Sequence, residues 1–205
     1  MMKLLMAALI ALLLLCGCTG SGAQAAAGAG AQQPAHGSFV VPASGIDYSA
    51  QYVVYEGSTQ VAKRVFRSGD RMRADVYSQG GNTFSIYLSG SFAYSCYSAG
   101  GPYECYDISA KLSQEQVDGM VAQPSLSGAK EAEDVDIGGT TGKCYAVPYD
   151  VYRQRKLCFT DRGVLAYDEY NATKESPHIE YLSSISYAAS DSDFQLPASP
   201  QALPQ

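Results

Sequence analysis

The chain has 205 residues, with 14 basic and 20 acidic side chains, a formal net charge of −6, and 16 tyrosines but no tryptophan. Removing Lys3 with an N-terminal signal leaves a net charge of −7. A surface this acidic repels phosphate groups, so we expect no binding to nucleic acid.

The N-terminus has the pattern of an export signal. One positive charge at Lys3 precedes an apolar run from Leu4 to Leu15, which is shorter than the roughly 20 residues that cross a bilayer. The run ends in Cys16-Gly17-Cys18, similar to the lipobox of secreted lipoproteins. Cys18 follows a small residue and is therefore the better acceptor. We predict that residues 1–17 are a lipoprotein signal peptide and that acylated Cys18 anchors the protein to a membrane, on the extracytoplasmic side.

Composition divides the rest of the chain. Residues 18–45 are rich in alanine and glycine and poor in large apolar side chains, so we expect a flexible tether. Residues 198–205 are interpreted as a flexible tail. The remaining residues, 46–197, are enough for one domain with a core of its own.

Alternation of apolar and polar residues predicts a mainly β domain. In RMRADVY, Met72 and Val76 point to one face, and in TFSIYL the same holds for Phe84, Ile86 and Leu88. About ten such runs are separated by short turns rich in glycine, serine, asparagine and aspartate, so neighbouring strands should pair antiparallel.

One helix is expected to interrupt the strands. Ser113 and Gln116 fit a capping box at its start. An apolar stripe follows, formed by Leu112, Val117, Met120 and Val121.

Two surface features remain open to more than one interpretation. The basic cluster of Lys63, Arg64, Arg67, Arg71 and Arg73 is interpreted as a solvated strand face, with a docking site as the alternative. Tyrosine suits a half-buried sheet surface, but it also suits an aromatic binding surface.

Four cysteines lie in the predicted domain, and export places them where disulfides persist. A turn at Gly100-Gly101 would put Cys96 opposite Cys105 as a non-hydrogen-bonded pair, whose Cα atoms lie about 4.5 Å apart. Cys144 and Cys158 are then paired, partly by elimination.

Patterns for catalysis or metal binding are missing from the sequence. The domain has no C-x-x-C, no H-E-x-x-H and a single histidine, His178, so we expect no metal, no cofactor and no enzymatic activity. Asn171-Ala172-Thr173 matches an N-glycosylation acceptor.

Three segments carry a resemblance to a known family: YVVYEG from Tyr52, KRVFRSGDRMRAD from Lys63, and DFQLP from Asp193. Together with the lipobox and tether, residues 46–197 resemble the LolA/LolB-like extracytoplasmic lipoproteins. The resemblance implies a curved antiparallel half-barrel, partly plugged by a helix, whose concave apolar face accepts acyl chains or another hydrophobe. The ligand-binding residues would then be Met72, Val76, Phe84, Ile86, Leu88 and Met120.

Two functions are therefore expected. The first is a membrane-anchored, non-enzymatic lipoprotein that binds a lipid or other hydrophobic ligand. The alternative is an envelope sensor or protein-interaction module, in which the sheet is fully packed and an exposed strand edge or tyrosine face meets a protein partner.

Overall fold

The structure is a computed structural model that describes residues 45–121, 124, 126–149, 153–173 and 176–203. Its strands are β1 Tyr48–Glu56, β2 Thr59–Ser68, β3 Arg71–Tyr77, β4 Asn82–Ser89, β5 Phe92–Ala99, β6 Glu104–Asp107, β7 Lys130–Ile137, β8 Thr140–Pro148, β9 Gln154–Phe159, β10 Leu165–Thr173, β11 Ser176–Ser186 and β12 Pro200–Ala202. The helices are α2 Gln114–Val121 and two 3-10 turns, η1 Ser109–Lys111 and η2 Asp191–Phe194.

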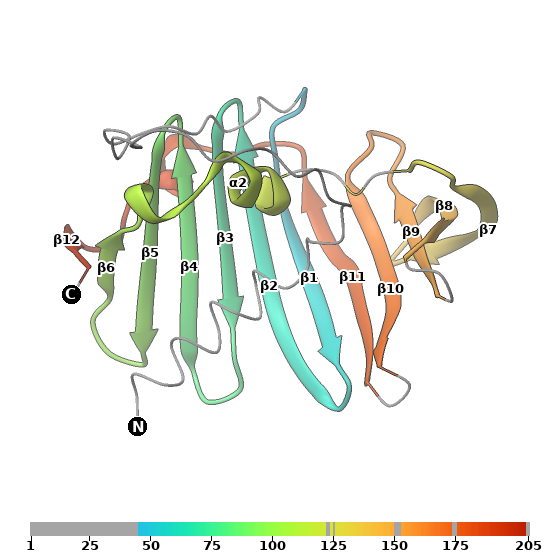
Figure 1. Ribbon diagram of the computed structural model, residues 1–205, viewed down its shortest axis with the longest axis horizontal. Helices are drawn as coiled ribbons and strands as arrows, with labels where there is room; N and C mark the ends of the chain where they lie inside the picture. The colour runs from blue at the N-terminus through green and yellow to red at the C-terminus, as the bar shows by residue number, and fades with distance from the viewer. Residues whose placement is uncertain (1–44, 122–123, 125, 150–152, 174–175, 204–205) are drawn as a thin grey trace, which may run out of the picture.

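The strands form one curved sheet in the order β12-β6-β5-β4-β3-β2-β1-β11-β10-β9-β8-β7 (Figure 1). Two antiparallel meanders, β1 to β6 and β7 to β11, are joined by pairing between β1 and β11. Tight turns set the first meander, because Gly57 (φ 61°) and Gly69 (φ 56°) adopt a backbone conformation that glycine tolerates best. The predicted mainly β, antiparallel half-barrel is confirmed.

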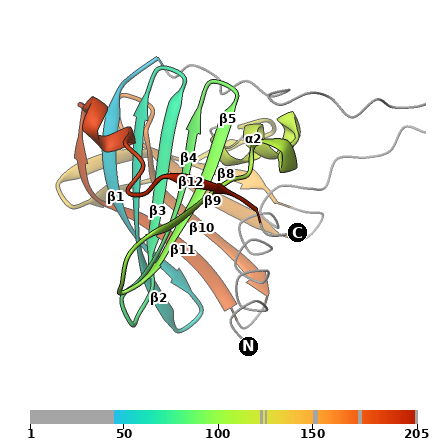
Figure 2. The same ribbon diagram turned by 90° about the vertical axis from the view of Figure 1, so that its left-hand side faces the viewer.

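The two faces of the sheet carry different coverings. Helix α2 lies on one side, which we call the inner face, and η2 lies on the other, the outer face (Figure 2). The predicted capping box starts α2: the backbone N–H of Gln116 donates to Ser113 Oγ at 3.3 Å, and the Ser113 N–H donates to Gln116 Oε1 at 2.8 Å. The apolar side of the helix is buried on the sheet through Val117 and Val121. At the other end of α2, Arg67 Nη1 donates to the Val121 carbonyl at 2.7 Å.

The C-terminal segment crosses the outer face over β3 to β6. Arg73 Nη1 donates to the Asp193 carbonyl at 2.8 Å, and the Arg71 guanidinium lies 4.5 Å from the Phe194 ring centroid. Leu196 packs against the buried cluster of Tyr87 and the Cys96–Cys105 pair. The segment ends in β12, which pairs with β6 and is the one strand in the described sheet that pairs parallel. Residues 200–202, expected in a flexible tail, therefore form part of the sheet.

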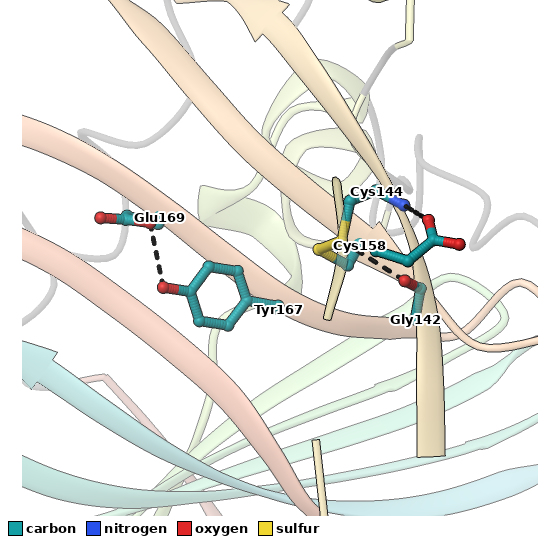
Figure 3. Close-up of a disulfide and its surroundings, with 6 residues drawn as sticks. Gly142, Cys144, Cys158, Tyr167 and Glu169 are labelled. Atoms are coloured by element: carbon teal, nitrogen blue, oxygen red, sulfur yellow. Dashed lines mark hydrogen bonds between the residues drawn. A yellow bond between two sulfur atoms is a disulfide. The ribbon is translucent and has the colours of Figure 1, made fainter. Parts of the chain in front are cut away.

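Both predicted disulfides are present. Cys96 and Cys105 face each other across β5 and β6 with Cα atoms 4.1 Å apart, in the register that also places Tyr97 opposite Glu104. Cys144 and Cys158 join β8 to β9 with a Cα separation of 4.0 Å (Figure 3). Gly142 lies against this bridge, since a Cβ added there would be 3.1 Å from the Cys158 Cβ. A side chain at position 142 would therefore push against the disulfide.

Candidate functional site

The residues predicted to bind a ligand lie on the inner face, and most of them belong to the core. Leu88 is 1% exposed and forms a cluster with Ala93, Val117 and Val121, against which Met72, Ile86 and Met120 pack. Phe84 is buried, and Val76 beside it is half-buried. Helix α2 therefore covers the part of the inner face that carries Met72, Ile86 and Leu88.

Two hollows in the described part of the chain lie elsewhere. One, of about 220 Å³, is lined mainly by β7 and β8, including Glu131, Asp134 and Lys143. The other, of about 290 Å³, lies on the outer face of β2, β1 and β11. Neither is lined by any of the six predicted ligand-binding residues.

The inner face of β2, β9, β10 and β11 carries charged side chains as well as buried aliphatic ones, Val65, Leu157 and Leu182. Lys63 Nζ donates to both oxygens of Glu180, at 2.8 and 3.1 Å, and Arg155 Nε donates to Asp168 at 2.7 Å. The strand register places Asp168 directly beside Glu180. Both carboxylates are buried, at 3% and 6% exposure. Paired charges and a buried apolar cluster that includes Tyr52, Val65 and Leu182 thus share this half of the inner face.

The electrostatics of the face agree with closed pairs. Burial alone would lower the pKa of Lys63. The charge of the facing Glu180 carboxylate and its hydrogen bond raise this pKa, so that the net pKa lies above its ordinary value. Burial also raises the pKa of Tyr52 well above 10. Its hydroxyl stays protonated and donates to the Leu165 carbonyl at 3.1 Å. The ammonium and the phenol both keep their protons at neutral pH.

Aromatic rings continue this layer. Tyr170 stacks on Tyr149 at 4.8 Å and on His178 at 4.6 Å between ring centroids. The Nδ1 of His178 lies 2.6 Å from Glu56 Oε1. The one histidine of the domain is therefore held between a ring and a carboxylate, as part of the packed inner face.

The basic cluster is divided between the two faces. Lys63 and Arg67 point inward, and Arg67 is only 7% exposed, so the interpretation as a solvated strand face is wrong for this residue. Arg71 and Arg73 point outward, where they hold the C-terminal segment. Alternation along a strand separates side chains that are close in sequence.

The outer face of β1, β10 and β11 is rich in tyrosine. The register aligns Val53, Tyr181 and Tyr167 in one row across three strands, with Tyr55 and Ile179 in the next. We call these five half-buried side chains the outer tyrosine face. Tyr55 and Tyr181 stack at 6.2 Å, and the Tyr167 hydroxyl donates to Glu169 at 3.0 Å (Figure 3). The contacts of the C-terminal segment lie over β3 to β6, on the far side of β2.

The edges of the sheet are poorly suited to pairing with another chain. At one edge, β7 has a register shift between Ala132 and Val135 and carries four acidic side chains: Glu131, Glu133, Asp134 and Asp136. At the other edge, β6 is occupied by β12. Bulges, charges and short covering strands are the usual ways of blocking edge pairing.

Two further findings concern only the described residues. Among them no helix is long and apolar enough to span a membrane. Among the same residues, no three or more histidine, cysteine, aspartate or glutamate side chains are grouped to hold a metal ion. Cys18, the predicted lipidation site, and the side chain of Asn171 lie outside the described part.

Sequence reasoning missed Arg155, Asp168 and Glu180. For Glu180 the sequence does contain an indication, because alternation along β11 places Glu180 on the same face as His178 and Leu182. What the alternation cannot indicate is that Lys63, 117 positions earlier, lies opposite.

Comparison with known proteins identifies similar folds. No family model matches the chain, and no curated protein matches it. A structure of the Pseudomonas aeruginosa MucA/MucB complex contains a similar chain, 12% identical, with 74% of this chain and 56% of that chain covered and a TM-score of 0.51. Free MucB is 14% identical over 74% of this chain and 57% of that chain, with a TM-score of 0.51. A LolA superfamily protein from Nitrosomonas europaea is 8% identical, with 76% of this chain and 93% of that chain covered and a TM-score of 0.35.

These similarities concern the fold. The chain spans little more than half the length of MucB, at 57%. The curved antiparallel sheet with a helix on its inner face is the architecture that the family resemblance implied, and the fold is similar to that of MucB.

Proposed function

We propose that the protein is a membrane-anchored, extracytoplasmic interaction module that binds a protein partner through the outer tyrosine face. One observation carries this proposal: the inner face, where a hydrophobic ligand would lie, is occupied by α2, by a buried apolar cluster and by paired charges, whereas the tyrosines of the outer face are half-exposed. A carrier of acyl chains needs an apolar cavity, and four of the six residues expected to line one, Met72, Ile86, Leu88 and Met120, belong to the cluster around α2. A fifth, Phe84, is buried.

The composition of the outer tyrosine face fits a protein partner. Tyrosine and arginine are enriched in protein interfaces, because a tyrosine ring adds contact area at low conformational cost and its hydroxyl forms hydrogen bonds. Three of the five side chains are tyrosines, and the same face continues into Ser49, Ser184 and Arg64. Since both sheet edges are blocked, a partner would meet this face and would not add a strand.

The proposed location rests on the N-terminal pattern and on the disulfides. The signal peptide of residues 1–17 and an acylated Cys18 would place the domain outside the cytoplasm, at the end of a tether. Two disulfides persist in such a compartment. The similar fold of MucB, solved in a complex with MucA, is compatible with a partner protein in the envelope.

Site-specific crosslinking in intact cells tests the proposal. A photoreactive phenylalanine analogue at Tyr55 or Tyr181 should give a discrete protein adduct, whereas the same analogue at Glu115, exposed on α2, should not. Adducts at none of these positions, or equally at all three, would contradict the proposed surface.

The lipid-binding alternative is tested on the purified chain. Native mass spectrometry after exposure to phospholipid vesicles should detect no retained lipid. Retained lipid that is lost on Leu88→Asp substitution, in a variant that keeps its β-sheet circular dichroism, would instead support a hydrophobic ligand on the inner face.

A further inference from the structure

The hollow on the outer face of β2, β1 and β11 contains an arginine whose donors are not used by the described part of the chain. The hollow measures about 290 Å³ and is lined by Ser49, Gln51, Arg64, Phe66, Ser184, Ile185 and Ser186. We call it the Arg64 hollow. It adjoins the outer tyrosine face, because the pair of Gln51 and Ser184 lies one row away from the pair of Val53 and Tyr181 on the same face of the sheet.

A bulge lies beside this hollow. The pairing of β1 with β11 shifts between Gln51 and Tyr52, and Ser183 Oγ donates to the Gln51 carbonyl at 3.0 Å. Bulges bend a strand and redirect its side chains, and they are common next to functional sites. Here the register shift falls at Gln51, which lines the hollow.

The guanidinium of Arg64 is held by an aromatic ring. It lies 5.7 Å from the centroid of Phe66, a buried side chain that Arg73 also contacts, at 5.1 Å. Ring contact orients a guanidinium without using its N–H groups. Among the described residues, Arg64 forms no ion pair or hydrogen bond, so its donors remain available.

The nearest carboxylates are already bound. Asp75, opposite Arg64 in the register, accepts from Arg73 Nε at 2.9 Å and from the Tyr77 hydroxyl at 3.1 Å. Asp193 accepts from the Ser190 N–H at 2.7 Å. Neither carboxylate forms a hydrogen bond or an ion pair with Arg64 among the described residues, and neither lines the hollow.

We infer that the Arg64 hollow binds a carboxylate, supplied by an acidic residue of the protein partner that covers the outer tyrosine face. The planar fork of an arginine matches the two oxygens of a carboxylate, and the hydroxyls of Ser49 and Ser184 and the amide of Gln51 provide further donors. No carboxylate lines the hollow. That this carboxylate belongs to a partner protein rests on the proposed function. Whether the hollow binds a carboxylate at all is tested separately.

The binding test uses the purified soluble chain and a blocked amino acid. N-acetyl-aspartate N-methylamide, titrated into ¹⁵N-labelled protein, should give saturable shifts at the amides of Ser49 and Ser184, and the neutral N-acetyl-asparagine N-methylamide should not. Arg64→Gln should weaken the binding roughly tenfold or more, the usual effect of losing a charge-assisted hydrogen bond. Arg64→Lys should lose less, and Arg162→Gln, on a surface arginine that lies over Tyr187, should lose nothing.

The outcomes separate the two proposals. Equal shifts with the acidic and the neutral probe, or binding unchanged in Arg64→Gln, would overturn the carboxylate site. Inorganic phosphate that binds more tightly than the aspartate probe would make the hollow a phosphate site and would also overturn it. Crosslinks at Tyr55 that persist at full yield in Arg64→Gln would leave the tyrosine interface in place but remove Arg64 from it.

Discussion

Replacing Glu180 with glutamine should destabilise the fold by about 3 kcal/mol, the lower end of the cost of breaking a buried ion pair. Glu180 is 6% exposed and accepts two hydrogen bonds from Lys63, so the substitution leaves an ammonium group facing a neutral amide. We expect the lower end of this range because the Lys63 side chain is 30% exposed, so that its ammonium group can be partly hydrated after the substitution.

Replacing both partners should cost far less than replacing one. In Lys63→Met/Glu180→Met the buried charges are removed together, and the free energy of unfolding should return to within about 1 kcal/mol of the parent. Urea titration followed by circular dichroism gives these values from the midpoint and slope. The matched control is Asp191→Asn, which removes the negative charge that pairs with Arg71. The Asp191 side chain is 88% exposed, so losing this ion pair should cost less than about 1 kcal/mol.

A small effect of Glu180→Gln would refute the reasoning. If the single substitution costs less than 1 kcal/mol, or if the double substitution costs as much as the single one, the inner face is not closed by coupled charges. The interior would then be wet, and the argument against a ligand on this face would lose its basis.

Three other predictions concern the bridge, the C-terminal segment and the anchor. Cys96→Ser/Cys105→Ser should lower the free energy of unfolding by about 2.5 kcal/mol, the loop-closure value for a sequence separation of 9, and an unchanged urea midpoint would contradict this. The hydrogen bond from the Ser190 backbone holds the pKa of Asp193 below its usual 3.8, so its contribution to stability is complete above pH 3.8 and is lost as the pH falls through the folded pKa. The protection factor for amide hydrogen exchange at η2, measured against the intrinsic rate at each pH, should therefore fall on acidification in the parent, and the fall should be smaller in Asp193→Asn. Cys18→Ser should move the protein from the membrane to the soluble fraction, and continued membrane association would argue against lipidation at this residue.

Local sequence patterns were enough to predict most of the strands, the helix and the Cys96–Cys105 disulfide, whereas Cys144 and Cys158 were paired partly by elimination. Alternation in RMRADVY and TFSIYL depends only on which face of a sheet is apolar, and the capping box of Ser113 and Gln116 depends on residues one helical turn apart. The Cys96–Cys105 pair follows from hairpin register, because the two cysteines lie nine positions apart around one turn. Each of these features is decided within a short stretch of chain.

What the sequence could not supply was the arrangement of segments distant in the chain. Pairing of β1 with β11 brings Lys63 to Glu180, and the return of the chain over β3 to β6 turns an expected tail into a covered edge. These contacts decide whether an apolar strand face is a ligand site or a core. The composition of the chain identifies apolar and tyrosine-rich strands, but only tertiary packing determines that Leu88 and Met72 are covered by α2 while Tyr55 and Tyr181 remain half-exposed, because burial depends on which distant surface lies above a residue.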